Sequence, residues 1–400
     1  MCPKGPGGGI LNDDMLRKDA LDYHASKPAG KITVVPSKPH GTQRELSLAY
    51  SPGVAYPCKE IEKDPDDAYR YTSKGNLVAV VSNGTAVLGL GDIGALAGKP
   101  VMEGKGLLFK AFADIDVFDI EVDRTDVDEF VEIVKAIAPT FGGINLEDIK
   151  APECFEIERR LVEELDIPVM HDDQHGTSIA VLAALINAIE LTGKKFEDAK
   201  FVFCGAGAGG IASTKLLLDH GAKNVTLVDS TGIIHRGRTD LTPIKLSMLS
   251  VTNPDDIHGG LAEAMKGADV FVGLAVAGAL TPQMVSSMAK DSIVFAMANP
   301  IPEIMPDLAS AAGAAVVGTG RSDFPNQINN SLVFPGVFRG ALDIKATRIT
   351  TGMKLAAAQA LAALIEEPTK ECVIPWSLDR NVSPAVAQAT ASAWTAENPR

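Results

Sequence analysis

A strand, a glycine-rich turn, a helix and a second strand follow one another in residues 200–232, and this order constrains the fold more than any other stretch. Gly205, Gly207 and Gly210 fit G-x-G-x-x-G, and the apolar strand VTLV ends at Asp229, near the offset of a ribose-binding acid. Glycines let the amides of a helix N-terminus approach a pyrophosphate. The stretch predicts a dinucleotide-binding unit. The alternative is a glycine turn that only allows tight helix packing.

The alternation of helices and strands continues beyond this unit. Residues 261–269 are typical of a helix, and 270–276 and 292–300 of strands, as in a doubly wound α/β sheet. Asn299 lies at the carboxyl end of the last of these strands, and Asn330 lies in a polar loop further on. Ligands of such sheets bind at carboxyl strand ends, so both asparagines are candidates for cofactor or substrate contacts. Either could instead form an ordinary Asx turn.

Two pairs of acids flank a helical pattern between residues 144 and 177. Glu147 and Asp148 precede the pattern, and Asp172 and Asp173 follow the short apolar strand 167–170. Gly176 to Ser178 then offer a hydroxyl cap for the next apolar helix. Acids gathered in this way repel one another unless a cation lies among them, and Mg²⁺ and Mn²⁺ take carboxylate ligands. The alternative is two solvated turns.

The region before these acids alternates apolar strands with tight turns. We expect strands at 77–81, 86–90, 107–112 and 117–122, an earlier short strand at 32–35, and an amphipathic helix at 127–141. Lys105, between two glycines and just before the expected strand 107–112, is either a surface lysine or one aimed into a cleft. Tyr50 precedes a Pro-Gly turn, a position more typical of a packing residue.

Length and charge limit the remaining possibilities. A chain of 400 residues exceeds one ordinary core, so we expect an N-terminal substrate and metal α/β domain (1–177), a Rossmann-like doubly wound domain (178–345) and a C-terminal helical segment (346–400) that packs back on the domain boundary. The net charge of -14 argues against nucleic acid and anionic membrane as partners. The start of the chain has the features of a loose tail, with neither a signal nor a transit peptide, so we expect a cytoplasmic protein.

Several motifs together resemble the malic enzymes, in particular the compact bacterial type. The resemblance covers about residues 15–365 and rests on LAYSPGVA, NGTAVLGLGDIG, GKPVMEGK, INLEDIKAPECF, HDDQHGT, the dinucleotide pattern, ANPIPE and GRSDFPNQINN. Some bacterial relatives carry an added phosphotransacetylase-like domain, which we do not expect in a chain of this length. The resemblance implies metal-dependent oxidative decarboxylation of L-malate to pyruvate and carbon dioxide, with reduction of NAD or NADP.

The resemblance also implies roles for individual residues. Glu147, Asp148 and Asp173 resemble the ligands of Mg²⁺ or Mn²⁺, and Asp172 resembles the partner that holds Lys105. Lys105 would be the base at the malate C2 hydroxyl, which requires that its pKa, about 10.4 when free, be lowered towards neutrality. Tyr50 would then protonate C3.

Further implied roles concern binding and assembly. Asn299 and Asn330 would hold the substrate carboxylates. In compact members of the family the tyrosine segment reaches a neighbouring subunit, so the resemblance implies a homodimer or a higher homo-oligomer.

The sequence departs from the family pattern at one position and leaves the cofactor open. Larger eukaryotic members place a substrate-binding arginine in the motif NGTAVLGLG, where this chain has Ala86; the amides of residues 83–85 or Arg321 could replace it. Asp229 suits the ribose of NAD, whereas the resemblance and the nearby Arg236 and Arg238 favour NADP.

Other functions remain as alternatives. A dehydrogenase that does not decarboxylate, an oxaloacetate decarboxylase or a nucleotide sensor would share the glycine pattern. A sensor would not need Lys105, Asp172 and Tyr50 together.

Overall fold

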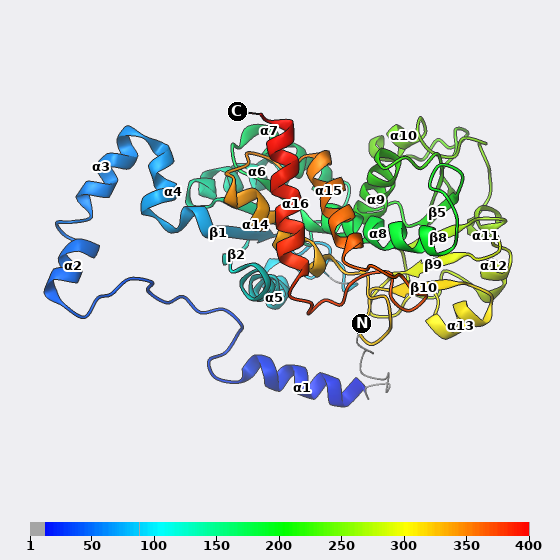
Figure 1. Ribbon diagram of the computed structural model, residues 1–400, viewed down its shortest axis with the longest axis horizontal. Coiled ribbons are helices and arrows are strands. Elements are labelled where there is room, and N and C mark those ends of the chain that lie inside the picture. The colour runs from blue at the N-terminus through cyan, green and yellow to red at the C-terminus, as the bar shows by residue number, and fades with distance from the viewer. Residues whose placement is uncertain (1–12, 88, 400) are drawn as a thin grey trace.

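The computed structural model describes residues 13–87 and 89–399, which contain two sheets side by side (Figure 1). The long helix α8 (Asp172–Leu191) connects the last strand of the first sheet to the first strand of the second. Residues 1–12, where the loose tail is expected, lie outside the described part. Within that part, no helix is both long and apolar enough to span a membrane.

The first sheet is parallel, and its strands lie in the order β2-β1-β3-β4. Its strands are β1 (Leu77–Ser82), β2 (Asp116–Glu121), β3 (Gly143–Leu146) and β4 (Val169–His171). Alternate residues of β1 enter two different cores: Val78 and Val80 pack on the side of α5 (Ala95–Ala113), and Ala79 and Val81 on the side of α6 (Val127–Ile137) and α7 (Glu153–Glu164). A strand covered on both faces is apolar along its length, as β1 is from residue 77 to 81, before Ser82 ends it.

The second sheet has the order β10-β9-β8-β5-β6-β7, in which only the β6–β7 pair is antiparallel. Its strands are β5 (Lys200–Cys204), β6 (Asn224–Asp229), β7 (Gly232–Ile233), β8 (Val270–Gly273), β9 (Ile293–Ala296) and β10 (Val316–Thr319). Its helices are α9 (Ala208–Asp219), α10 (Pro243–Met248), α11 (Leu261–Met265), α12 (Pro282–Ser286) and α13 (Pro306–Ala311). The strand order reverses at β5, because β6 lies on one side of it and β8 on the other, and ligands bind at such a switch point.

The C-terminal helices return to the first sheet. They are α14 (Phe334–Asp343), α15 (Thr351–Ala363) and α16 (Val382–Glu397). Helix α14 packs on α5, and α15 packs on α8. The C-terminal segment, which follows the second sheet in the sequence, therefore covers helices that flank the first sheet.

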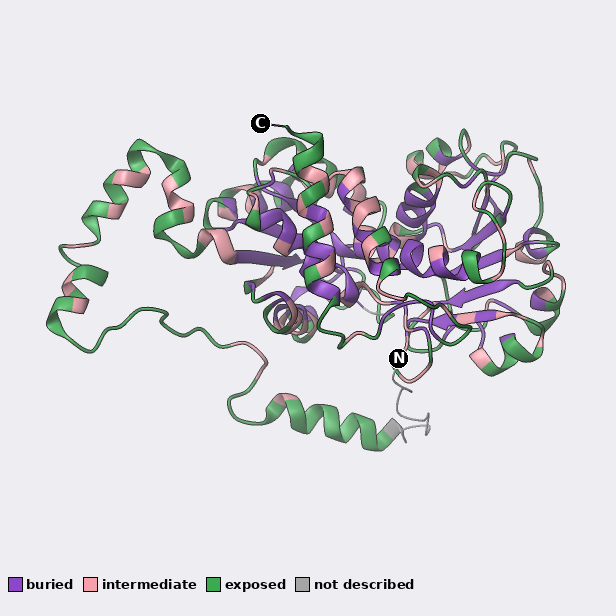
Figure 2. Ribbon diagram, in the orientation of Figure 1, coloured by how far each residue is buried: buried purple, intermediate pink, exposed green. Residues whose placement is uncertain are grey.

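An N-terminal arm extends away from both sheets. It contains α1 (Asp13–Ala25), α2 (Gln43–Ala49), α3 (Ala55–Lys63) and α4 (Ala68–Tyr71), with short 3₁₀ turns before and after α4 at Pro65–Asp67 and Ser73–Asn76. Two further 3₁₀ turns lie outside the arm, at Ala138–Thr140 and Asn330–Leu332. Figure 2 shows that α1 to α3 are exposed over most of their surface. The exposed residues include large apolar ones such as Leu48, Tyr50 and Tyr56.

The structure corrects several expected elements. The expected strand 107–112 belongs to α5, because its apolar residues form one buried helical face that includes Phe109. Short apolar runs fit both periodicities. The expected strand at 86–90 is a turn around a bridge between Val87 and Gly91 in the described residues, and 32–35 is irregular.

The start of α8 is also different from the expected one. The helix begins at Asp172, with no side-chain cap, rather than after a cap in Gly176 to Ser178. Asp172 and Asp173 therefore lie in the first helical turn, where negative charge is stabilised by the helix dipole.

Candidate functional site

The two pairs of acids meet at the carboxyl edge of the first sheet. Strands β3 and β4 pair in parallel with Leu146 opposite His171, so the residues that follow each strand are neighbours. The amide of Asp148 donates a hydrogen bond of 2.8 Å to Asp173 Oδ2. Asp148 has a φ of 53°, a left-handed conformation that aspartate tolerates better than most residues.

Lys105 reaches the same edge from α5. Its Nζ forms an ion pair with Asp172 and lies 3.0 Å from Glu147 Oε1. The ring of Phe334 lies 4.5 Å from Nζ, so the charge is enclosed by apolar surface as well as by the acids. Lys105 and Asp172 are both buried. The structure thus brings together a lysine and the acids that the sequence placed in separate segments.

The charges of the acids affect the pKa of Lys105. Burial lowers this pKa, but the neighbouring carboxylates of Asp172 and Glu147 raise it by more, so it lies above its ordinary value. The lowered pKa expected from the sequence is that of a lysine beside a bound cation, and it stays a prediction. Balancing the carboxylates with a cation removes the cause of the increase.

Three of the acids can hold a metal ion. Oxygen atoms of Glu147, Asp148 and Asp173 all lie within 4.8 Å of one another. Burial raises the pKa of Glu147 well above its ordinary value, and the charge of Asp173 raises it further against the opposing effect of Lys105. Such a concentration of buried negative charge is stabilised by a hard divalent cation, for which these oxygens are suitable ligands. Asn145 Nδ2 donates to Glu147 Oε2 at 3.0 Å and fixes this side chain.

A cavity of about 290 Å³ connects the acids to the second sheet. Asp148 and Asp173 line it on one side, Gly207 to Gly210 on another and Asn299 on a third. Glycine is needed sterically at Gly210, because a Cβ there would lie 1.8 Å from the Gly205 carbonyl oxygen. Helix α9 begins at Ala208 without a side-chain cap, so its first amides are available to an anion. The cavity can therefore hold the pyrophosphate of a dinucleotide next to the metal ligands.

Asp229 lies at the end of β6 and is already engaged. Arg238 donates to both of its carboxylate oxygens, at 2.7 and 3.1 Å, and Lys245 donates to Oδ2 at 2.7 Å. Burial would raise the pKa of Asp229, but the hydrogen bonds from Arg238 and Lys245 lower it to about 2. Arg238 also pairs with Asp240.

Not every candidate residue lies at this site. Tyr50 is 76% exposed on the N-terminal arm, which extends away from the acids. Arg321 forms a bidentate pair with Asp323, at 2.9 and 2.7 Å. Asn330 does lie near α8, because a Cβ at Gly176 would come within 3.0 Å of its Cβ.

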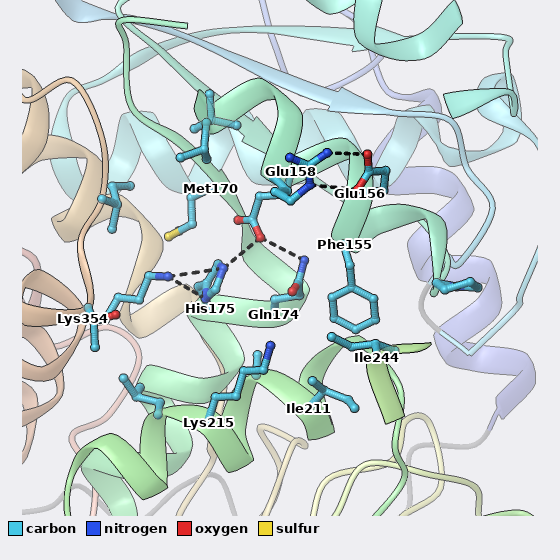
Figure 3. Close-up of a pocket in the computed structure, with 18 of the residues that line it drawn as sticks. Phe155, Glu156, Glu158, Met170, Gln174, His175, Ile211, Lys215, Ile244 and Lys354 are labelled. Atoms are coloured by element: carbon cyan, nitrogen blue, oxygen red, sulfur yellow. Dashed lines mark hydrogen bonds and ion pairs between the residues drawn. The ribbon is translucent and has the colours of Figure 1, made fainter. Parts of the chain in front are cut away.

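Other residues beside the site were missed from the sequence. Glu158, His175 and Lys354 form a hydrogen-bonded row at a second cavity, of about 980 Å³ (Figure 3). His175 belongs to the motif HDDQHGT, which was the available signal, but Lys354 is 179 residues away from it. Phe334, which encloses Lys105, lies in the segment SLVFPG and gave no separate signal.

Two family descriptions match consecutive parts of the chain. Residues 29–162 match "Malic enzyme, N-terminal domain", and residues 174–394 match "Malic enzyme, NAD binding domain". The second match begins at Gln174, in the first turn of α8, directly after the acids Asp172 and Asp173.

Individual proteins that are similar to this chain are also named malic enzymes. The bifunctional malic/malolactic enzyme of Bacillus subtilis is 54% identical, over 94% of this chain and 93% of the relative. The NADP-dependent malic enzyme of Haemophilus influenzae is 56% identical over 90% of this chain, which spans about half (48%) of that protein. The crystal structure of malic enzyme from Pyrococcus horikoshii superposes with a TM-score of 0.92 at 50% identity, over 96% of this chain and 91% of the other.

Proposed function

We propose roles for individual residues of a chain that belongs to the malic enzyme family, whose members decarboxylate malate oxidatively with NAD or NADP. The chain is an NAD(P)-dependent oxidoreductase that decarboxylates malate. The observation that carries the residue roles is the buried Lys105–Asp172 pair, which lies beside three carboxylates at a cavity lined by the glycine turn.

Lys105 is the proposed base. Oxidation of malate removes the C2 hydroxyl proton and transfers a hydride from C2 to the nicotinamide, and Nζ of Lys105 takes the proton. Asp172 holds this nitrogen in place through the buried ion pair. Loss of the C4 carboxylate as carbon dioxide leaves an enolate, and a proton added at C3 gives pyruvate.

Glu147, Asp148 and Asp173 would hold Mg²⁺ or Mn²⁺. When bound, the cation supplies Lewis-acid polarisation of the substrate oxygen. The same carboxylates raise the pKa of Lys105 while their charges are unbalanced, so a loaded site is the state in which Lys105 can act as a base. Asn299, at the cavity, and Asn330, near α8, would orient the substrate carboxylates, and Asn299 also the cofactor.

Tyr50 is the proposed acid at C3, and it would act in a neighbouring subunit. The arm that carries Tyr50 extends away from the acids of its own chain and exposes Leu48, Tyr50 and Tyr56. Apolar residues exposed on an extended segment favour docking on another surface. We therefore propose a homodimer in which each arm completes the other subunit's site, in the cytoplasm as expected from the sequence.

NADP is the proposed preferred cofactor. Because both oxygens of Asp229 already accept hydrogen bonds from Arg238, this carboxylate is a poor acceptor for the ribose hydroxyls of NAD. The guanidinium of Arg238 and the ammonium of Lys245 supply donors for a 2'-phosphate.

The assay that tests the proposed function follows absorbance at 340 nm with L-malate and either nucleotide, with Mn²⁺ or with a chelator, and measures pyruvate separately. We expect metal-dependent reduction of the nucleotide with an equal amount of pyruvate. Reduced nucleotide without pyruvate would indicate a dehydrogenase that does not decarboxylate, and no reduction with either nucleotide would contradict the residue roles.

A further inference from the structure

The first turn of α8 contributes residues to two cavities. Asp173 and Thr177 line the cavity of about 290 Å³, whereas Gln174 and His175 line the larger one of about 980 Å³. Residues four apart lie on one face of a helix, and Asp173 and His175, two apart, point in nearly opposite directions. A contact that fixes Gln174 and His175 therefore also fixes the direction in which Asp172 and Asp173 point.

Glu158 holds this turn from α7. One of its carboxylate oxygens accepts from the amide of His171 at 2.8 Å. The other accepts from Gln174 Nε2 at 3.1 Å and faces His175 Nε2 at 3.0 Å. These three partners lie on both sides of Asp172 and Asp173 in the chain, so a single, largely buried side chain fixes the ends of the segment that carries both acids.

Lys354 holds the turn from the other side. Because the carboxylate of Glu158 can only accept, His175 carries its proton on Nε2, and its Nδ1 is left to accept from Lys354 Nζ at 3.0 Å. Figure 3 shows His175 between Glu158 and Lys354 at the cavity wall. Lys354 belongs to α15, so the row joins the C-terminal helices to the first sheet.

We propose that Glu158 and Lys354 are positioning residues that act through Gln174 and His175 to hold Asp172 and Asp173 in place for metal binding. This inference rests on the proposed metal-binding role of Asp173. Removing a partner that orients a metal ligand typically weakens metal affinity about 10- to 100-fold. We expect dinucleotide binding at Gly207 to Gly210 to change little, because this turn belongs to the start of α9 and contributes no member of the row.

The test measures Mn²⁺ binding directly, by the loss of the free-ion signal in electron paramagnetic resonance, together with NADP⁺ binding by fluorescence. Glu158→Ala and Lys354→Ala are expected to raise the Kd for Mn²⁺ about 10- to 100-fold and to leave the Kd for NADP⁺ unchanged. Lys215→Ala is the matched control, because Lys215 lines the same cavity and its side chain has no hydrogen bond or ion pair in the described part of the chain, although its charge also lowers the pKa of Lys354. It should bind Mn²⁺ as the unmodified chain does.

Chemical rescue separates positioning from general damage. The cavity next to Lys354 gives a small amine access to the space left in Lys354→Ala. Propylammonium, which has N–H donors, should recover most of the lost Mn²⁺ affinity, and tetramethylammonium at the same ionic strength should not. This rescue experiment tests the proposal even if Glu158→Ala fails to fold.

The variant Asp173→Ala distinguishes a failure of the positioning role from a failure of the proposed metal site. If this variant loses Mn²⁺ binding while Glu158→Ala and Lys354→Ala keep full affinity, the positioning role is wrong. A Lys354→Ala variant with reduced affinity that tetramethylammonium restores as well as propylammonium also contradicts it. If Asp173→Ala itself binds Mn²⁺ normally, the proposed metal site is wrong.

Discussion

Lys105 and Asp172 form a buried ion pair although 67 residues separate them in the sequence. Lys105 lies in the middle of α5, and Asp172 is the first residue of α8. A buried pair of this kind is costly to break, because removing one partner leaves an uncompensated charge. The pair lies beside three carboxylates and next to the cavity that the glycine turn lines, so a catalytic role best explains why such a costly pair is present.

Lys105→Ala should lower kcat by about 10²- to 10⁴-fold, as expected for loss of a general base, and leave the Kd for NADP⁺ nearly unchanged. Lys110→Ala is a control on the same helix, because Lys110 is exposed and pairs with Asp114 and Asp116. The two measurements are steady-state kinetics and fluorescence titration. Turnover of the Lys105 variant at the level of the control would refute the proposed role.

Glu147→Gln should separate metal binding from folding. Because burial and Asp173 disfavour the charged form of Glu147, the metal-free variant should unfold at the same temperature as the unmodified chain or above it. A bound ligand at 100 times its Kd stabilises the folded state by about 2.7 kcal/mol, and the variant should lose this gain. Thermal scans with Mn²⁺ and with chelator measure both effects. An equal upward shift of both chains by Mn²⁺ would exclude Glu147 as a ligand.

Mixed dimers test the role of the arm. Tyr50→Phe and Lys105→Ala should each be nearly inactive, and co-refolded subunits should regain about a quarter of the full activity if Tyr50 acts in the neighbouring subunit. Half of the dimers are then mixed, and each has one complete site. If Tyr50 acts in its own chain, the mixture stays inactive. Sedimentation of the unmodified chain as a monomer would also contradict the exchange.

Arg238→Ala should change the choice of cofactor. The variant loses a donor for the 2'-phosphate and frees Asp229 to accept ribose hydroxyls, so kcat/KM should fall for NADP and stay level or rise for NAD. Equal losses with both nucleotides would show that Arg238 acts on the fold and not on the 2' position.

Acid stability should depend on Glu158. Burial alone would raise the pKa of Glu158, but His175 and Lys354 lower it from 4.5 to about 2. A lowered pKa stabilises the folded state above the ordinary value and loses this effect as the pH falls towards 2, on the order of 3 kcal/mol in total. In urea titrations between pH 5 and 3, Glu158→Gln should therefore lose less stability than the unmodified chain. Parallel losses in the two chains would contradict this assignment.

The sequence was most informative where residues within one short stretch determine the local structure by themselves. The glycine pattern at 205–210 and the acid at Asp229 predicted the strand, turn and helix of β5 and α9, because a local close approach of the backbone requires glycine at Gly205 and Gly210. The expected strand at 107–112 was wrong because its apolar residues also form a helical face, and only packing against α14 decides between the two.

Asp229 shows the limit of a motif. The spacing predicted an acid near the ribose, but Arg238 and Lys245, which neutralise it, reach it through the fold of a loop and of α10.

The sequence by itself determined which residues have the chemistry: carboxylates after two strands, glycines at a helix start, and a lysine between glycines. Only the tertiary structure decided that Lys105 meets Asp172, that Glu158 and Lys354 meet at His175, and that Tyr50 lies away from its own site. The physical reason is that local pattern records burial and backbone conformation along the chain, whereas ion pairs between distant segments depend on how whole sheets and helices pack.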